Sequence, residues 1–502
     1  MAQRQITGRR PSRLQRAVNR IFVQNKLYNW VGVLVGLLIA GSMGYLLAQY
    51  TVLGLGVFGL AVALAIILTC LFSPTTGFYV NMVYCLFIYQ AGRMLGRDDL
   101  PVGTVIDVLG ITILFGYFIK GISLKERFNE FARSPVVILI IINFLWGAME
   151  IFNPEGHSIV AWGQAVRRAI ETFVFLYVIY LILEDKRHVR RYIRTFFVVM
   201  VIVAAYGCLQ EAVGLFGFER AWVEADQIRF GLTFINGQFR KFSTFNDPAA
   251  FGAMMAAVSV FFIVLAMNER KKRTKRVLFA GSIVMIAGML FSGTRTANVM
   301  LIAGLGMYVL LTINRVSTRV FALGAAFLLI GILYAPIYSN YSLNRFRSSF
   351  IGTHDESYNV RVMARNFIRP YMLSHPFGGG LATTNNIGLT LNPGHPLAGF
   401  QTDSGYLQLA LEIGWVGLGL ICILFYMILK KGVQCYFRGR DDDMRTVYAA
   451  GVCAIFSYYV GMFAQNTLGH LEDMTFYYPL IAIFLRFKYY ENPDLPPAAA
   501  GG

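Results

Sequence analysis

The sequence predicts an all-α, polytopic transmembrane helical bundle, and two observations indicate this fold class. Hydrophobic residues make up 56% of the 502 residues and charged residues 14%, with a mean hydropathy of +0.55. This balance is untypical of a soluble globular protein. Apolar runs long enough to cross about 30 Å of hydrocarbon recur along the whole chain. Because the runs are continuous rather than alternating, they favour helices over a β-barrel.

The apolar runs divide the chain into spans, two large loops and terminal arms. We expect about fourteen spans, near 30–49, 52–72, 77–91, 102–119, 136–152, 169–183, 195–213, 249–267, 277–293, 297–314, 319–336, 405–429, 446–465 and 474–488. The predicted segments are a basic arm (1–29), N-terminal spans (30–213), a first loop (214–248), central spans (249–336), a large, partly helical loop (337–404), C-terminal spans (405–488) and a tail (489–502).

Basic residues are distributed unevenly between the two sides of this predicted bundle. If the arm 1–29 is cytoplasmic, 31 of the 45 lysines and arginines fall in inner segments, as expected from the cytoplasmic excess of these residues in membrane proteins. An even number of spans then makes both termini cytoplasmic and both large loops external. Topology and anionic lipid headgroups account for the net charge of +18, so we expect no nucleic-acid partner.

The six cysteines give no indication of a disulfide framework or a metal site. All of them lie in predicted spans or inner segments. None lies in an external loop, and no pair has the CxxC spacing of a metal site. The candidate chemistry therefore rests on other residue types.

Thirteen of the fourteen basic residues outside the predicted inner segments are arginines, and the fourteenth is Lys241. Arginine binds phosphate with a rigid, always charged fork, which indicates a phosphate-bearing lipid or an acidic glycan as ligand. In the first loop, Arg240 and Lys241 precede Pro248, with either Asn246 or Asp247 expected to cap a helix that has this proline in its first turn. The positive end of that helix would add to an anion site. Solvated loop charges are the alternative.

In the large loop, Arg361, Arg365 and Arg369 are spaced at i, i+4 and i+8, so on a helix they share one face. Like charges at this spacing repel each other, so an external anion or a protein partner is expected beside them. A solvated surface helix is the alternative. Aromatic residues such as Tyr358 are interleaved with the charged residues of this loop, and such rings suit stacking on sugar faces.

Two further residues lie at predicted membrane boundaries. Arg295 separates two apolar runs, and an arginine at that depth is costly unless it is paired or binds an anion, so it is a functional candidate. Asp403 lies where the large loop re-enters the membrane. It is predicted either to cap the next helix, with Glu412 further along that helix, or to accept a proton or a sugar hydroxyl.

Four motifs in order resemble the superfamily of O-antigen ligases and Wzy-type polysaccharide polymerases. They are Ser292 to Ala297 at a span boundary, Ser357 to Arg361, the run His375 to Gly380, and Asp403 to Leu418 with its Tyr-Leu-Gln and Glu-x-Gly elements. The resemblance covers roughly residues 225–430. Each motif alone is weak, and their order, spacing and shared external position carry the resemblance.

The resemblance implies glycan transfer from a polyprenyl-diphosphate carrier at the periplasmic face of the bacterial inner membrane, without a metal or other cofactor. Arg295 and Arg361 match the arginines of the family and are expected to hold the diphosphate. Asp403 completes the predicted catalytic set. The predicted substrate-binding residues are Arg240, Lys241, Arg365, Arg369, Tyr358, Tyr406 and His395. Expected partners are the lipid-linked oligosaccharide, membrane lipids and a chain-length regulator.

The sequence departs from the ligase pattern at the helix that follows the large loop. Ligases of the family have a His-Asn pair there, whereas this chain has Asp403-Ser404. The departure favours a polymerase that joins lipid-linked repeat units over a ligase that transfers the glycan to lipid A or a protein. His354 and His395 are alternative bases. A lipid-linked sugar transporter is a more distant alternative, since no convincing internal repeat is visible.

Overall fold

The computed structural model describes residues 37, 40–42, 44–45, 48–96, 102–120, 124–156, 158–235, 237–334, 341–348, 350 and 356–492. The predicted basic arm 1–29, most of the span at 30–49, and the tail from residue 493 lie outside the described residues. The chain divides into two compact units, Met1–Thr69 and Cys70–Gly502. The second unit contains every candidate site residue.

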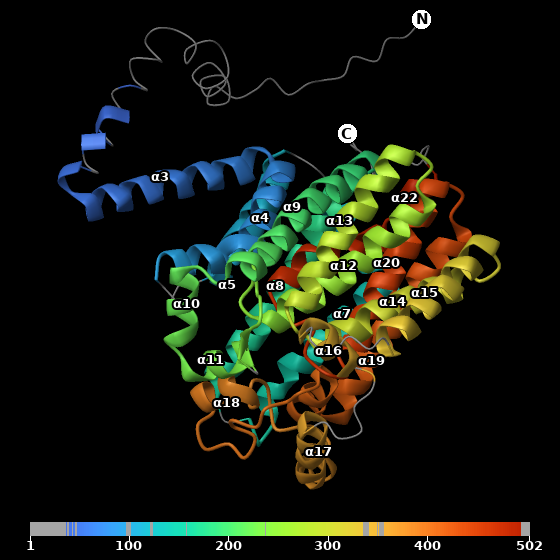
Figure 1. Ribbon diagram of the computed structural model, residues 1–502. Coiled ribbons are helices and arrows are strands. Elements are labelled where there is room, and N and C mark those ends of the chain that lie inside the picture. The colour runs from blue at the N-terminus through green and yellow to red at the C-terminus, as the bar shows by residue number, and fades with distance from the viewer. Residues whose placement is uncertain are drawn as a thin grey trace, which may run out of the picture. The chain divides into compact units, whose positions relative to one another are not determined.

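The described chain is helical almost throughout (Figure 1). Its first half contains α3 (Thr51–Phe72), α4 (Pro74–Met94), α5 (Val102–Ile119), α6 (Leu124–Ala132), α7 (Pro135–Met149), η2 (Glu150–Phe152), α8 (Ile159–Ile182), α9 (Lys186–Val213), α10 (Gly217–Glu224), α11 (Gln227–Thr233) and a hairpin of β1 (Phe234–Ile235) and β2 (Gln238–Phe239). The second half contains α12 (Pro248–Asn268), α13 (Lys272–Phe291), α14 (Arg295–Thr312), α15 (Val316–Tyr334), α16 (Tyr341–Ser348), α17 (Glu356–Ser374), α18 (Asn385–Leu391), α19 (Gly405–Arg438), α20 (Asp442–Gly461), η3 (Glu472–Thr475), α21 (Tyr477–Leu485) and α22 (Phe487–Glu491).

Seven described helical segments are long and apolar enough to cross a membrane: Pro135–Phe152, α9, α12, α13, α14, α15 and α19. This confirms an all-α polytopic membrane protein. The number of spans and the side of the membrane on which each terminus and loop lies stay predictions. Most helices lie where the apolar runs predict them, but α8 begins at Ile159, well before the expected 169, and α21 is only nine residues long.

Helix α12 forms the centre of the second unit. It is apolar on all sides rather than on one face, which is typical of a helix surrounded by other helices. It packs against α13, α14 and α20, and 89% of its most apolar 18-residue stretch is buried. Asp247 caps α12 as expected, since its Oδ1 accepts hydrogen bonds from the Ala249 and Ala250 amides at 2.7 and 2.9 Å.

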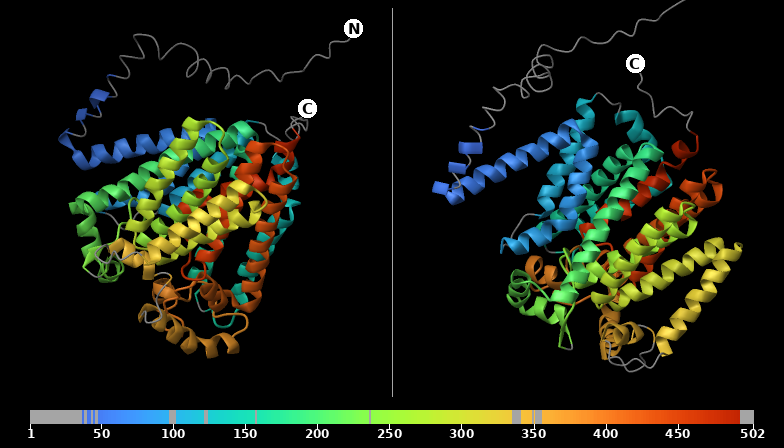
Figure 2. Two further views of the ribbon diagram at one scale, coloured as in Figure 1. Left: turned by 45° about the vertical axis from the view of Figure 1, so that its right-hand side comes forward. Right: turned by 45° about the horizontal axis from the view of Figure 1, so that its top comes forward.

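The helices of the second unit have two distinct ends (Figures 1 and 2). At one end, which we call the loop end, lie α10, α11, α16, α17 and α18. At the other, which we call the turn end, lie the short connections that precede α9, α13, α15 and α20. Helices α12, α14 and α19 all begin at the loop end, so the positive ends of their dipoles point there.

A buried polar network holds the first loop against the bundle. Glu219 of α10 is fully buried and accepts hydrogen bonds from Tyr206 at 2.7 Å and Gln210 at 2.8 Å. Arg93 of α4, also buried, donates to the carbonyls of Ser243 and Phe245 at 2.8 and 2.7 Å. These bonds satisfy polar groups that would be costly to bury alone, and they fix the segment that leads into α12.

Gly252, one turn into α12, allows close approach of the segment before α14. A β-carbon at Gly252 would lie only 2.8 Å from the β-carbon of Thr294. Gly252→Ala is therefore expected to lower the stability of the detergent-solubilised protein by about 1–3 kcal/mol, because Thr294 must move. The measurement is the unfolding midpoint followed by circular dichroism.

Gly306→Ala in α14 is the matched control for this prediction. A β-carbon there meets no atom within 4 Å, and alanine is the better helix former, so its midpoint should equal or exceed that of the unmodified protein. Equal midpoints for the two variants would contradict the tight packing at Gly252.

Candidate functional site

The turn Ser292–Thr294 lies at the loop end between α13 and α14, and it is the structural centre of the candidate site. Gly293 has a φ of 60°, a left-handed conformation that glycine adopts without strain. The Thr294 hydroxyl donates to the Pro248 carbonyl at 2.9 Å, which joins the turn to the start of α12. Arg295, the first residue of α14, follows directly and is half-buried.

Two further arginines converge on this turn. Arg240 donates from Nε to the Ser292 carbonyl and from Nη2 to the Thr294 hydroxyl, both at 2.9 Å. Arg345, from α16, donates from Nε to the Gly293 carbonyl at 2.6 Å. We call Arg240, Arg295 and Arg345 the arginine cluster. Together with the N-terminus of α14, it concentrates positive charge and guanidinium donors in a way that favours an anion.

Lys241 has a different environment from its neighbour Arg240. Its side chain is buried, its Nζ donates to the Phe239 carbonyl at 2.7 Å, and it forms an ion pair with Glu211 at 3.2 Å. The sequence grouped the two cations together. The structure pairs the buried lysine with the exposed carboxylate of Glu211.

The segment between α20 and η3 contributes a cluster that sequence reasoning did not single out. His470 lies with its Nδ1 3.9 Å from Oδ2 of Asp247, the residue whose Oδ1 caps α12. Tyr458 donates to Asp473 at 3.2 Å, and Glu472 is almost fully buried. A histidine and two acids at a span boundary are the signal that could have identified it.

The protonation of this acid–histidine cluster responds to its surroundings. Burial disfavours the charged form of His470, but the carboxylates of Asp247, Asp473 and Glu472 outweigh it and raise the pKa of the imidazole. Burial raises the pKa of Glu472 and that of Asp473 to about 7, and the nearby His470 only partly offsets this. The cluster can therefore exchange protons near neutral pH.

The start of α19 lies against the end of α20. Ser404, not Asp403, caps α19: its side chain accepts from the Leu407 amide at 3.4 Å and donates to the Met462 carbonyl at 3.1 Å. Asp403 precedes this cap and is exposed. Ser404 therefore takes the capping position that was one of the two predictions for Asp403.

Residues of α17 and α19 meet at Phe463. The Tyr406 ring packs on Phe463 with centroids 4.8 Å apart, and its hydroxyl donates to the Tyr459 carbonyl at 3.0 Å. Arg365 of α17 reaches the Phe463 carbonyl at 3.5 Å. The structure therefore brings Arg365 and Tyr406 together through this residue.

The glycine run 378–380 interlocks with a kink in α19. The amides of Gly379 and Gly380 donate to the carbonyls of Leu411 and Glu412 at 2.7 and 3.0 Å. Gly414 has a φ of 69°, and a β-carbon there would lie 2.6 Å from the Phe377 α-carbon. Gly378, Gly380 and Gly414 are required by the close approach of backbone atoms, whereas a β-carbon at Gly379 would meet side chains.

The Glu412 side chain forms further hydrogen bonds that hold the loop between α17 and α19. Its carboxylate accepts hydrogen bonds from the Thr384 hydroxyl, from Gln408 at 3.3 Å and from the Ala382 amide at 3.3 Å. The Glu-x-Gly motif and the glycine run are therefore in direct contact. Together they determine the conformation of the loop that follows α17.

The remaining predicted residues occupy separate places in this loop. His395 is 5% exposed, its Nδ1 accepts from the Leu397 amide at 3.1 Å, and its ring packs beside Gly379. Arg369 is exposed on α17. Arg361 and Tyr358 belong to α17, but their side chains lie outside the described part of the structure, as does His354.

Gly414→Ala is expected to destabilise the loop, because alanine is strained at a φ of 69° and its methyl group overlaps the backbone of 376–377. We expect a loss of about 1–3 kcal/mol, seen as faster cleavage within 375–404 in limited proteolysis. Gly419→Ala is the control on the same helix, since a β-carbon there meets nothing within 4 Å. Identical cleavage patterns would show that the interlock does not hold the loop.

The comparison with known protein families bears directly on this loop end. Residues 280–422 match the family model described as O-antigen ligase. The matched segment contains the turn Ser292–Thr294, Arg295, α16, α17 and the interlocked glycine motifs. No curated protein matches the chain. The match confirms, for residues 280–422, the resemblance of this chain to the O-antigen ligase and Wzy-type polymerase superfamily.

Proposed function

We propose that this protein is a membrane glycosyltransferase that joins polyprenyl-diphosphate-linked oligosaccharide units into a longer chain. One observation carries the proposal: Arg240 and Arg345 both bind the turn that begins α14 at Arg295. This arginine cluster lies within or beside the segment matching the O-antigen ligase model. Fixed guanidinium groups at a helix N-terminus suit the diphosphate of a lipid carrier.

Charge stabilisation on the leaving group is the main task of the site. When the bond between the anomeric carbon and the carrier oxygen breaks, negative charge develops on the diphosphate. Arg295 and Arg361 are proposed to bind that charge directly, with Arg240, Arg345 and Arg365 supporting them. Preorganised donors of this kind stabilise a developing anion without reorganisation. Arg369 and Tyr358 of α17 are proposed to contact the glycan.

The acceptor is a hydroxyl group of a second lipid-linked unit. Its oxygen forms the new bond to the anomeric carbon, the carrier diphosphate leaves with the bonding electrons, and the hydroxyl proton passes to a base. Asp403 is one candidate, because it is exposed at the start of α19. His470 is the other, because its imidazole lies beside Asp247 and the first turn of α12, with Nδ1 3.9 Å from the Asp247 carboxylate.

The distribution of charge supports a proposed location. The turn end contains Lys186 at the start of α9 and Arg270 and Arg315 in the short connections, as expected of a cytoplasmic side. The loop end would then face the periplasm of a bacterium, where lipid-linked glycans are exposed. Membrane lipids surround the bundle, and a chain-length regulator is an expected partner.

A ligase that transfers the glycan to lipid A or a protein is the second candidate. The description of the matching family model favours it. The pair Asp403-Ser404 at the start of α19 argues against it, because the resembled ligases have His-Asn there. Both reactions use the same donor and the same leaving group, so they differ only in the acceptor.

Arg295→Ala and Arg361→Ala are each expected to reduce polymer formation about a hundredfold or more, because each removes a donor to the leaving diphosphate. The measurement is the size distribution of surface glycan in a deletion strain that expresses each variant. Single repeat units on the surface or on the carrier indicate a lost polymerase. Long chains still on the carrier indicate a lost ligase.

Arg220→Ala is the matched control for the arginine substitutions. Arg220 is exposed on α10 at the same end of the bundle and pairs with Glu224 at 2.8 Å, away from the arginine cluster. Its removal should leave the glycan profile unchanged. Normal polymer from Arg295→Ala at equal membrane abundance would rule out a role for that arginine in diphosphate binding.

The two candidate bases predict different pH profiles. A base acts in its neutral form, so with His470 the rate should rise with pH through its raised pKa. Asp247→Asn keeps the helix cap but removes one carboxylate that raises that pKa, so the acidic limb should move to lower pH. Glu472, Asp473, Arg168 and Tyr478 also surround the ring and are left unchanged.

Asp403→Asn and His470→Gln complete this experiment. If His470 is the base, His470→Gln abolishes turnover and Asp403→Asn leaves the acidic limb in place. Retained turnover in His470→Gln, with loss in Asp403→Asn, would assign the proton to Asp403 instead. The assay is the initial rate of polymer formation in membranes with lipid-linked donor, measured as a function of pH.

A further inference from the structure

A cavity of about 860 Å³ opens at the turn end, away from the arginine cluster. It is lined by residues of α9, α12, α13, α14 and α20 and of the connections between them. The donor site proposed above lies at the start of α12 and α14, whereas this cavity lies at their other ends. The cavity therefore does not belong to the site already described.

Positive charge dominates the lining of this cavity. The cationic lining residues are Arg190, Arg194, Arg270, Lys271, Arg315 and Arg445, and the anionic ones are Glu269, Asp442 and Asp443. Six cations against three carboxylates leave three positive charges in excess. Cations that merely followed membrane topology would spread over the surface, but these six border one hollow.

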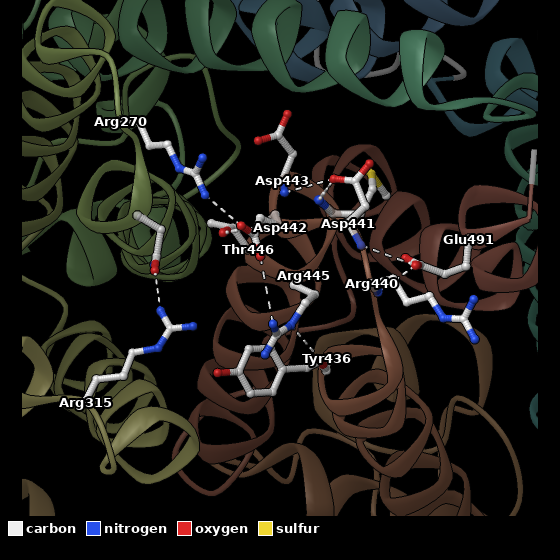
Figure 3. A network of polar contacts seen from close by, with 12 residues as sticks. Arg270, Arg315, Tyr436, Arg440, Asp441, Asp442, Asp443, Arg445, Thr446 and Glu491 are labelled. Carbon is white, nitrogen blue, oxygen red and sulfur yellow. Dashed lines mark hydrogen bonds and ion pairs between the residues drawn. The ribbon is translucent and has the colours of Figure 1, made fainter.

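Ion pairs with carboxylates involve some of the cavity's cations and not others; Figure 3 shows the pair of Arg270 with Asp442. Arg270 binds Asp442 at 2.7 Å, and Arg190 binds Asp443 at 2.8 Å. Arg315 instead donates to the neutral amide oxygen of Asn268 at 2.9 Å. Among the described residues, no carboxylate pairs with Arg194, Lys271 or Arg315.

Apolar side chains also line the cavity. They include Phe262 of α12 and Tyr308 of α14, which are both buried, and the partly buried Leu278 of α13. The Tyr308 hydroxyl accepts from the Asn268 amide at 3.1 Å, so it marks the boundary between polar and apolar lining. A ligand that fills this space has an anionic group at the mouth and can place carbon chains against these apolar side chains.

We propose that this cavity binds a phosphate-bearing anion, with Arg194 and Arg315 as its principal ligands. Phosphate matches the planar fork of arginine and benefits from several charged donors at once. The source is either a phospholipid headgroup, whose acyl chains would contact the apolar wall, or a soluble phosphate compound. Either ligand would place a phosphate group at the mouth of the cavity. Only the phospholipid would also place acyl chains against the apolar wall.

The test uses the full chain purified in detergent and analysed by native mass spectrometry. The probes are phosphatidylglycerol, phosphatidylcholine and inorganic pyrophosphate. The double variant R194Q/R315Q removes two cations that have no carboxylate partner among the described residues, so it leaves no acid unpaired. We expect it to lose affinity for the anionic probe about tenfold or more, because charge-assisted hydrogen bonds disappear.

R273Q/R276Q is the matched control, because both arginines are exposed near the start of α13 and do not line the cavity. It removes the same charge from the same end and should bind as the unmodified protein does. Selective loss of phosphatidylglycerol in R194Q/R315Q supports the site with a lipid source, and selective loss of pyrophosphate supports it with a soluble source. Two outcomes would overturn the proposal. One is equal binding of the anionic probes by both double variants, and the other is binding of phosphatidylcholine by the unmodified protein as strong as that of phosphatidylglycerol.

Discussion

The hydrogen bond from the Thr294 hydroxyl to the Pro248 carbonyl is the interaction on which the loop end depends. It joins the first turns of α12 and α14, and Gly252 provides the space for it. Once the turn Ser292–Thr294 is held there, its carbonyls and hydroxyl become acceptors for Arg240 and Arg345. A buried contact between neutral groups thus determines where the charged side chains meet.

The sequence was sufficient to predict the helices but not how their ends meet. Hydropathy reports burial in lipid or protein, so α12, α14 and α19 begin close to the expected residues. The cap of α12 is a local pattern, and Asp247 was one of the two residues predicted for it. The early start of α8 was not, because it contains Arg167 and Arg168. Arg167 pairs with Asp107 of α5, which no local pattern reveals.

In the candidate site, too, local sequence patterns were predicted better than the contacts between distant residues. Arg240 and Lys241 are adjacent, yet one binds a turn more than fifty residues away and the other binds Glu211. Residue type indicates what a side chain can bind, whereas its partner depends on the tertiary fold. The glycine run 378–380 was visible as a motif, but only the structure relates it to Gly414. His470 was overlooked because its carboxylate partner Asp247 lies far away in the sequence.

The direction of the helices favours negative charge at the loop end. Helices α12, α14 and α19 begin there, and each N-terminus stabilises negative charge nearby. The negative charge of Asp247, which caps α12, is stabilised in this way. An anion beside Arg295 would be stabilised by the N-terminus of α14. Glu472 and Asp473 lie outside the first turns of these helices, and burial raises the pKa of each to about 7. The protonation of both acids therefore responds to His470, whose neighbour Asp247 caps α12.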